Sequence, residues 1–245
     1  MKLTWEARLG LGLITASVII YLIKLQVLAN PEVTINYIFN SLGFLPINVL
    51  IVTLIINQLL AMRSKREKLE KLNMVIGTFF SEVGTGLLAT LSDHDPDLDE
   101  VRGDLIIRGD WTDDEFDALK REMSAFNFSV SMPPAELESL RGWLVEHRSF
   151  LIRLLENPVL LEHESFTDLL RAVFHLTEEL DRRPAIDSLP DSDLEHLTGD
   201  ITRVYERLTL EWLNYMQYLR RTFPYLFSLA MRTNPFDEQA SVVVG

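Results

Sequence analysis

The sequence predicts an all-α protein in which a two-span transmembrane helical hairpin continues into a cytoplasmic α-helical domain. Residues 37–62 contain no charged side chain. A basic cluster follows at once, made of Arg63, Lys65, Arg66, Lys68 and Lys71. Beyond it apolar residues recur at helical spacing, and runs typical of strands are almost absent. These three observations predict the hairpin in residues 1–62 and the helical domain in residues 111–233.

The second span is expected at residues 38–62. At a rise of ~1.5 Å per residue, this segment is long enough to cross the ~30 Å hydrocarbon layer of a bilayer. Basic residues are enriched on the cytoplasmic side of membrane helices, so the basic cluster indicates that the second span ends in the cytoplasm.

The first span is expected at residues 9–29. Lys24 lies within it, but a lysine near a helix end can extend its amine to the lipid headgroups. The connecting turn, residues 30–36, carries one charge, Glu32. Lys2 and Arg8 precede the first span, so both basic clusters fall on one side of the membrane. Both termini are therefore predicted to be cytoplasmic, at an inner or plasma membrane. The alternative is a signal peptide cleaved after Ala29, which would leave very little chain outside the membrane.

Residues 63–92 combine the basic cluster with an apolar stretch that contains one charge, Glu82. We expect this stretch to be a helical extension of the second span that packs in the cytoplasm. A third or re-entrant span is the alternative. It is less favoured because a carboxylate at mid-membrane costs on the order of 2.5–3.5 kcal/mol.

Charge is divided unevenly along the chain. Residues 1–72 hold eight basic and four acidic residues, a net charge of +4, so the total of −13 leaves −17 for residues 73–245. Such an acidic domain repels the phosphates of nucleic acids, so no nucleic-acid partner is expected and a cytoplasmic protein partner is left open. The chain has no cysteine, which excludes disulfides and thiolate chemistry.

Four helices are expected in the cytoplasmic domain, over about residues 112–126, 133–156, 160–183 and 192–223. Thr112 and Glu115 have the spacing of a capping box at the start of the first helix. Ser192 and Glu195 repeat that spacing at the start of the last helix. Pro224 should end the last helix, because proline has no amide proton to donate.

An acidic linker is expected at residues 93–110. Aspartates occupy alternate positions at its start, namely Asp93, Asp95, Asp97 and Asp99. Alternating oxygen ligands resemble the start of a calcium loop, so these four residues are weak metal candidates. Leu98, however, stands where such a loop needs glycine for its sharp turn. A solvated linker is therefore the preferred interpretation.

The histidines offer one arrangement with chelating geometry. His175 and Glu179 are four residues apart and project from the same face of the expected helix. That face is charged, so a solvent-exposed charge ladder is preferred over a metal site. Other pairs, such as Glu195 and His196, are adjacent residues that diverge by about 100° on a helix and do not easily chelate one ion.

Small residues recur at four-residue spacing in both apolar regions. They are Gly12 and Ala16 in the first span, and Gly77, Ser81 and Thr85 in the extension of the second. Such spacing lets two helices approach closely. We interpret these residues as candidates for a seam between the subunits of a homo-oligomer, with ordinary packing inside one chain as the alternative.

A pore is a further hypothesis for the second span. If several copies form a ring, the amides of Asn40, Asn48 and Gln58 fall on one side of the helix. Ile51 and Ile55 lie between them, and amide rings separated by isoleucine rings resemble a hydrophobic gate. Amides that bond neighbouring helices explain the same residues more economically.

Aromatic residues gather towards the C-terminus. They are Tyr205, Trp212, Tyr215, Tyr218, Phe223, Tyr225 and Phe227. Such a group more often builds a core or a subunit contact than a ligand pocket. Residues 234–245 are expected to form a turn and a loose C-terminal tail.

These observations predict a non-enzymatic integral membrane protein. It forms a homo-oligomer in the lipid bilayer, and its acidic domain scaffolds other proteins or relays a signal. An oligomeric ion channel is the alternative. The sequence contains no phosphate loop, nucleophile elbow or zinc-protease signature, so no catalytic residue and no cofactor are expected.

Overall fold

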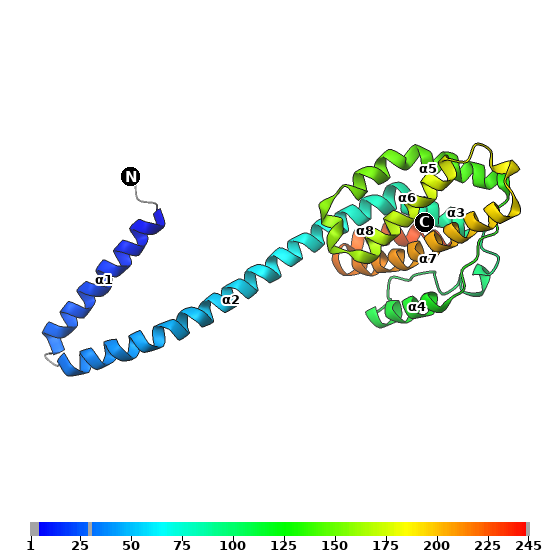
Figure 1. Ribbon diagram of the computed structural model, residues 1–245. Coiled ribbons are helices and arrows are strands. Elements are labelled where there is room, and N and C mark those ends of the chain that lie inside the picture. The colour runs from blue at the N-terminus through cyan, green and yellow to red at the C-terminus, as the bar shows by residue number, and fades with distance from the viewer. Residues whose placement is uncertain (1–4, 29–30, 244–245) are drawn as a thin grey trace. The chain divides into compact units, whose positions relative to one another are not determined.

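The computed structural model describes residues 5–28 and 31–243, and this part of the chain is helical and contains no strand (Figure 1). The predicted all-α class is confirmed. The chain divides into two compact units, residues 1–65 (unit 1) and residues 66–245 (unit 2).

Unit 1 contains helix α1, Trp5–Leu28, and the first part of helix α2, Pro31–Phe79. The turn expected at residues 30–36 is wrong from Pro31 onward, where the chain is already helical. The reason is local, because proline suits the first position of a helix, where its missing amide proton is not needed. Residues 29–30 lie outside the described residues.

One described helix, which includes α2, is long and apolar enough to cross a membrane, judged by length and composition. In α1 the described apolar stretch, Ile14–Lys24, is shorter than a bilayer crossing. The two-span hairpin therefore stays a prediction. Lys24, the charged residue of the expected first span, holds its amine 4.6 Å from the centre of the Tyr37 ring.

Unit 2 begins within α2 and continues through a π-helical turn, Phe80–Gly84, into helix α3, Thr85–Ser92. The apolar stretch after the basic cluster lies in the core of this unit, with buried side chains at Leu72, Ile76, Phe79, Phe80, Val83, Leu87, Leu88 and Leu91. The prediction of a packed helix is confirmed. Because protein covers these side chains, their burial favours the packed helix over the alternative of a third span.

The π-helical turn depends on glycine. A Cβ at Gly84 would lie 2.6 Å from Cδ1 of Phe80 and 2.8 Å from Cε1 of Phe79. Both rings pack in the core, where the centre of the Phe79 ring lies 5.4 Å from that of Phe166 in an edge-to-face arrangement. The turn therefore lets two consecutive aromatic residues enter the core.

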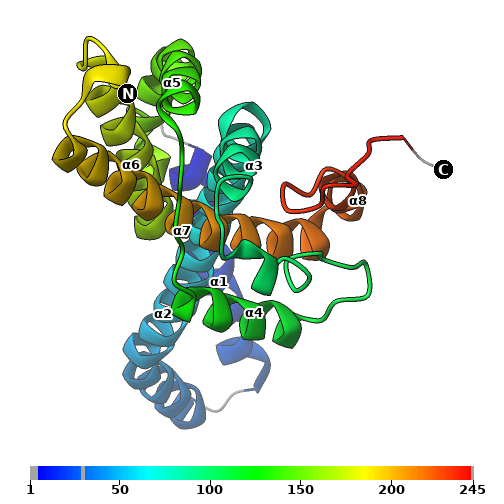
Figure 2. The ribbon, with the colours of Figure 1, turned by 90° about the vertical axis from the view of Figure 1, so that its right-hand side faces the viewer.

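Five helices complete unit 2, namely α4 (Asp113–Ala125), α5 (Pro134–Leu155), α6 (Glu164–Asp181), α7 (Asp191–Thr222) and α8 (Pro224–Arg232). Short 3₁₀ turns occur at Leu98–Glu100, Pro158–Glu162 and Ile186–Ser188. Helix α7 is central, since it packs against α3, α4, α6 and α8, while α5 packs against α6 (Figure 2).

The starts of these helices test the capping predictions. Thr112 and Glu115 form the predicted capping box at the start of α4. The second capping box is wrong, because Pro190 is the N-cap of α7 and Ser192 already lies in its first turn. Helix α6 starts later than expected, at Glu164, after a 3₁₀ turn and with His163 as its N-cap. Pro224 does end α7, as predicted.

The acidic linker and the C-terminal segment are both packed. Within the linker the side chains of Leu98 and Leu105 are fully buried, whereas Asp93, Asp97 and Asp99 are exposed. The expectation of a solvated linker therefore holds for these three carboxylates and is wrong for the apolar residues between the charges. The expectation of a loose C-terminal tail is also wrong for its first residues, 234–236. The Asn234 side-chain amide donates to the main-chain oxygen of Leu105 (2.9 Å), and the buried Phe236 ring lies 5.2 Å from Trp212. Apolar residues spaced between the charges provide this anchoring.

Candidate functional site

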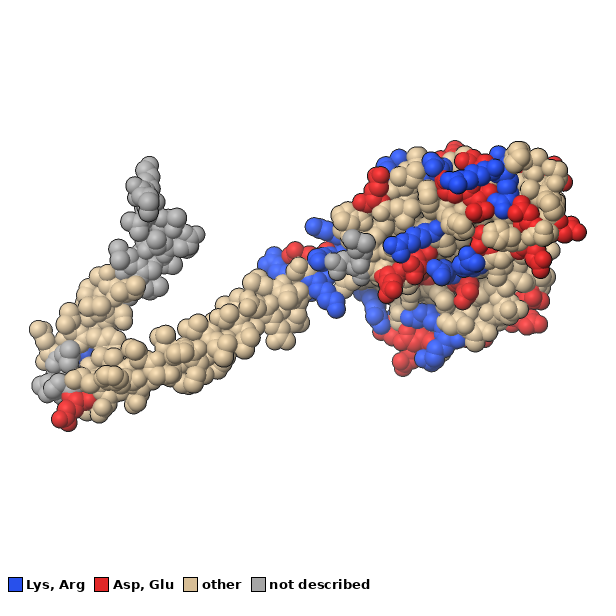
Figure 3. Space-filling model, in the orientation of Figure 1, with Lys and Arg blue, Asp and Glu red and all other residues tan. Residues whose placement is uncertain are grey.

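The surface of α2 is the most unusual feature of unit 1. An 18-residue window of this helix has a mean hydropathy of 2.1, and none of the window is buried. Figure 3 shows a length of uncharged surface there, whereas unit 2 carries many acidic and basic side chains on the face in view. Exposed apolar area on this scale marks a contact with lipid or with another protein.

The pore-lining candidates all lie on this exposed part of α2. The amides of Asn40, Asn48 and Gln58 are exposed, and none of them has a hydrogen-bond partner among the described residues. Ile51 and Ile55 are exposed as well. Because the helix is exposed on all sides here, exposure alone does not distinguish a pore-lining face from a lipid-facing one.

The seam candidates do not share one environment. Gly12 and Ala16 are exposed in unit 1. In unit 2, a Cβ at Gly77 would lie 3.1 Å from the hydroxyl oxygen of Tyr215, whereas Ser81 is exposed. Gly77 therefore serves the close approach of α7 inside the chain, and the alternative of ordinary packing holds at this position.

Asp95 is the buried member of the aspartate run. Its Oδ1 accepts hydrogen bonds from the main-chain amide of Asp97 (3.0 Å) and the hydroxyl of Ser129 (3.2 Å). The same hydroxyl lies 3.1 Å from Oδ2 of Asp97. Burial raises the pKa of the Asp95 carboxyl. These bonds join the start of the linker to the segment before α5.

The other two aspartates point elsewhere. Asp99 pairs with Arg102 at 3.2 Å, and Asp93 is exposed at the edge of a cleft. Among the described residues, no three His, Asp or Glu side chains surround a common position as they stand. The structure therefore does not bring the four weak metal candidates together.

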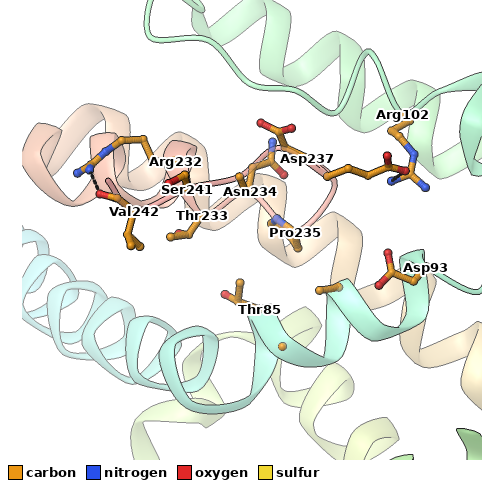
Figure 4. Close-up of a pocket in the computed structure, with 14 residues that line it drawn as sticks. Thr85, Asp93, Arg102, Arg232, Thr233, Asn234, Pro235, Asp237, Ser241 and Val242 are labelled. Atoms are coloured by element: carbon orange, nitrogen blue, oxygen red, sulfur yellow. Dashed lines mark hydrogen bonds and ion pairs between the residues drawn. The ribbon is translucent and has the colours of Figure 1, made fainter. Parts of the chain in front are cut away.

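The cleft has a volume of about 590 Å³ and lies between α3, the linker and the C-terminal segment (Figure 4). Thr85 lines it, and Arg102 and Arg232 stand towards opposite ends. Arg232 donates to the main-chain oxygen of Val242, which holds the C-terminal segment beside the cleft. The described lining mixes arginines with carboxylates and includes no histidine.

The aromatic group belongs mainly to the core. Tyr205, Trp212 and Phe227 are buried, which confirms the core interpretation for these three. The Tyr215 ring stacks on Phe80 with ring centres 5.0 Å apart. Burial raises the pKa of the Tyr205 hydroxyl.

A charged network joins α4 to α7. Asp113, in the first turn of α4, accepts a hydrogen bond from Nε of Arg221 (2.9 Å) and another from Arg220. Gln217 accepts a bond of 3.0 Å from the amine of Lys120. The hydrogen bond from Arg221 is the main reason why the pKa of Asp113 falls to about 2.

The polar face of α6 is only partly the charge ladder that its sequence predicts. Arg183 donates to Glu179 at 2.7 Å, as neighbours one turn apart on such a ladder would. His175 instead contacts α7, where Oδ2 of Asp200 lies 3.5 Å from its Nε2. Asp200 was not predicted as a site residue from the sequence. It stands four residues after His196, which is the same spacing as between His175 and Glu179.

The family models that match this chain divide it near the boundary between unit 1 and unit 2. Residues 68–232 match a family model described as the C-terminal helical domain of uncharacterized protein MJ1433, and residues 1–60 match the N-terminal helical domain of MJ1433. The "Uncharacterized protein MJ1433" of Methanocaldococcus jannaschii is 41% identical over 235 residues, covering 96% of this chain and 94% of its own. No solved structure matches. The chain therefore belongs to the MJ1433 family.

Proposed function

We propose that this protein is a non-enzymatic integral membrane protein that forms a homo-oligomer, with unit 2 acting as a cytoplasmic scaffold or signal relay. The observation that carries the proposal is the apolar window of α2, with a mean hydropathy of 2.1 and no buried share. A surface of this kind in water would aggregate, whereas in a bilayer it is solvated by lipid chains.

The amides of α2 support the homo-oligomer. Asn40, Asn48 and Gln58 have no partner within the described chain. An amide left without a hydrogen bond in hydrocarbon costs several kcal/mol. A neighbouring copy of the same helix can satisfy these groups, which makes self-association the simplest arrangement within a membrane.

Unit 2 supports the scaffold or relay role through its charge and its core. It has its own hydrophobic core, and the chain beyond residue 72 carries a net charge of −17 by difference. Many acidic side chains lie on the face shown in Figure 3. Such a surface favours partners with a basic face and disfavours nucleic acids and anionic lipid.

Membrane integration and assembly are tested on the full chain in two steps. The protein should stay in the membrane pellet after alkaline carbonate extraction, and native mass spectrometry in nanodiscs should show more than one copy. Release into the supernatant would overturn the membrane assignment. A monomer in nanodiscs would overturn the homo-oligomer while leaving the membrane assignment intact.

An ion channel is the second candidate, favoured by the position of Ile51 and Ile55 between the partnerless amides of α2. Reconstituted protein should then conduct ions, and Asn48→Asp should change the flux while leaving assembly intact. Asn57→Asp is the matched control, because at 100° per residue Asn57 projects from a different side of the helix than Asn48. Unchanged flux in Asn48→Asp, or an equal change in both variants, would argue against the pore.

A further inference from the structure

Two helices of unit 2 face each other with matching polar pairs. On α6, His175 and Glu179 are one turn apart, and on α7, His196 and Asp200 are one turn apart. Residues at this spacing project from the same face of a helix. Because α6 packs against α7, the two pairs can meet across the helix contact.

The distances show that they do meet. Nε2 of His175 and Nε2 of His196 each lie 3.5 Å from Oδ2 of Asp200. Nε2 of His196 also lies 3.9 Å from Oε2 of Glu179. Two imidazole nitrogens from different helices therefore approach a single carboxylate oxygen, with a second carboxylate close by.

Asp200 supplies a second observation at the same position. The residue is only 3% exposed, yet its Oδ2 has no hydrogen-bond partner in the described structure. Its Oδ1 accepts a hydrogen bond from Arg203 (2.8 Å). Buried carboxylate oxygens without a partner are costly and uncommon. Here the orphaned oxygen is the one that the two imidazoles approach.

We propose that the cluster is a binding site for a divalent transition metal, with zinc as the reference ion. The ligands are Nε2 of His175, Nε2 of His196 and Oδ2 of Asp200, and Glu179 stands beside the fourth position. Two imidazoles with a carboxylate suit zinc and its neighbours, whereas magnesium and calcium take oxygen ligands. The ion would give the buried Oδ2 of Asp200 a direct partner.

Two of the three separations between ligand atoms are close to what a tetrahedral ion requires. Bonds of 2.0–2.1 Å place neighbouring ligand atoms about 3.4 Å apart, near the 3.5 Å separations seen here. As they stand, the side chains do not yet enclose one position. Both imidazoles are about half exposed, at 52% for His175 and 54% for His196, so rotation about their side-chain bonds can bring them onto the ion with little repacking.

Arginines hold the carboxylates in place around this position. Arg203 occupies Oδ1 of Asp200 and leaves Oδ2 for the ion. Arg183 donates to Oε2 of Glu179 (2.7 Å), the same oxygen that lies 3.9 Å from Nε2 of His196, so this carboxylate stands beside the ion and is not one of its ligands. Such outer hydrogen bonds orient metal ligands, and their loss weakens metal binding by about 10- to 100-fold in known sites. An ion here would join α6 to α7.

The test uses the full chain, purified without a polyhistidine tag, stripped with a chelator and placed in nanodiscs. Zinc titration by calorimetry should show one ion per chain and should raise the unfolding temperature of unit 2. Cobalt should give the intense visible absorption of a tetrahedral complex. His175→Ala and His196→Ala should each weaken zinc binding by more than about tenfold and abolish the cobalt spectrum.

Two further variants make the assignment sharper. Arg203→Gln should weaken zinc binding without removing it, since it disturbs only the orientation of Asp200. His147→Ala, on α5, is the matched control and should leave binding unchanged, because its ring contacts the main-chain oxygen of Trp143.

Three results would overturn the site. They are no zinc binding in the millimolar range, binding that survives both His175→Ala and His196→Ala, and a cobalt spectrum typical of six oxygen ligands. The histidine variants remove partly exposed rings, so they should fold and the test remains informative.

Discussion

Helix α2 presents the same residue types in opposite environments along its length. Leu54, in unit 1, exposes 59% of its surface, whereas Leu72, in unit 2, is fully buried. Helical structure is therefore independent of burial here. What differs is the pattern, because the first part is apolar on every side and the second part alternates an apolar face with a polar one. A uniformly apolar helix suits a lipid solvent, and an amphipathic helix suits a protein core.

The largest expected effect is a difference in stability between two phenylalanine substitutions, one in each environment. Phe166→Ala removes a fully buried ring from the core of unit 2 and should lower the free energy of unfolding by about 3–5 kcal/mol. Phe39→Ala, at a position exposed by 73%, should leave unfolding of unit 2 unchanged. Urea titration of the full chain in nanodiscs, followed by tryptophan fluorescence, measures both. Equal losses would show that the environments do not differ as described.

A charge in the apolar window should have the next largest effect. Leu54→Arg should reduce the share of protein that resists carbonate extraction, since arginine at the centre of a membrane helix costs about 2.5–3.5 kcal/mol. Leu69→Arg places the same charge beside the basic cluster and should be tolerated. If both variants remain fully membrane-bound, the window does not lie in lipid.

Capping distinguishes what local sequence predicts from what packing selects. Thr112→Ala should lower the free energy of unfolding of unit 2 by about 1 kcal/mol, because it removes the N-cap of α4. Ser192→Ala should change it much less, because the N-cap of α7 is Pro190. The same urea titration compares them, and an equal loss in Ser192→Ala would contradict the observed start of α7.

The smallest expected effect is a change in stability at acidic pH. The pKa of Asp113 falls from 3.8 to about 2 because Arg221 and Arg220 bind its carboxylate. Because the pKa is lowered in the folded protein, the Asp113 carboxylate stabilises the folded state above pH 4, and this stabilisation is lost as the pH falls towards 2. The difference in urea midpoint between the native chain and Asp113→Asn should therefore shrink across this range. Asp114→Asn, one residue along and exposed, is the control; a pH-independent difference would contradict the assignment.

Much of the helical architecture could be predicted from local patterns. The apolar spacing from Leu72 to Leu91 was sufficient to predict a packed helix, and Thr112 with Glu115 to predict a capped one. Failures occurred where two local signals competed. Ser192 with Glu195 resembles a capping box, yet Pro190 two residues earlier has the backbone geometry of an N-cap, with φ −62° and ψ 152°, and the helix starts there.

The candidate sites were harder to predict, because they depend on contacts between distant residues. Gly77 matched a helix-association motif, but its role is set by Tyr215, far along the chain. Asp95 and Phe236 lie in segments whose composition is typical of loops, and their burial depends on partners such as Ser129 and Trp212. Composition describes a segment's average polarity, whereas burial depends on which surfaces meet.

By itself the sequence determined the all-α class, the apolar character of the first unit and the amphipathic faces of the second, since these follow from hydrophobicity and helical periodicity. Only the tertiary structure decided that His175, His196 and Asp200 converge, that the linker and C-terminal segment pack, and that Gly77 faces Tyr215. The physical reason is that periodicity specifies the face on which a side chain lies, while the partner of that face is chosen by the packing of the whole unit.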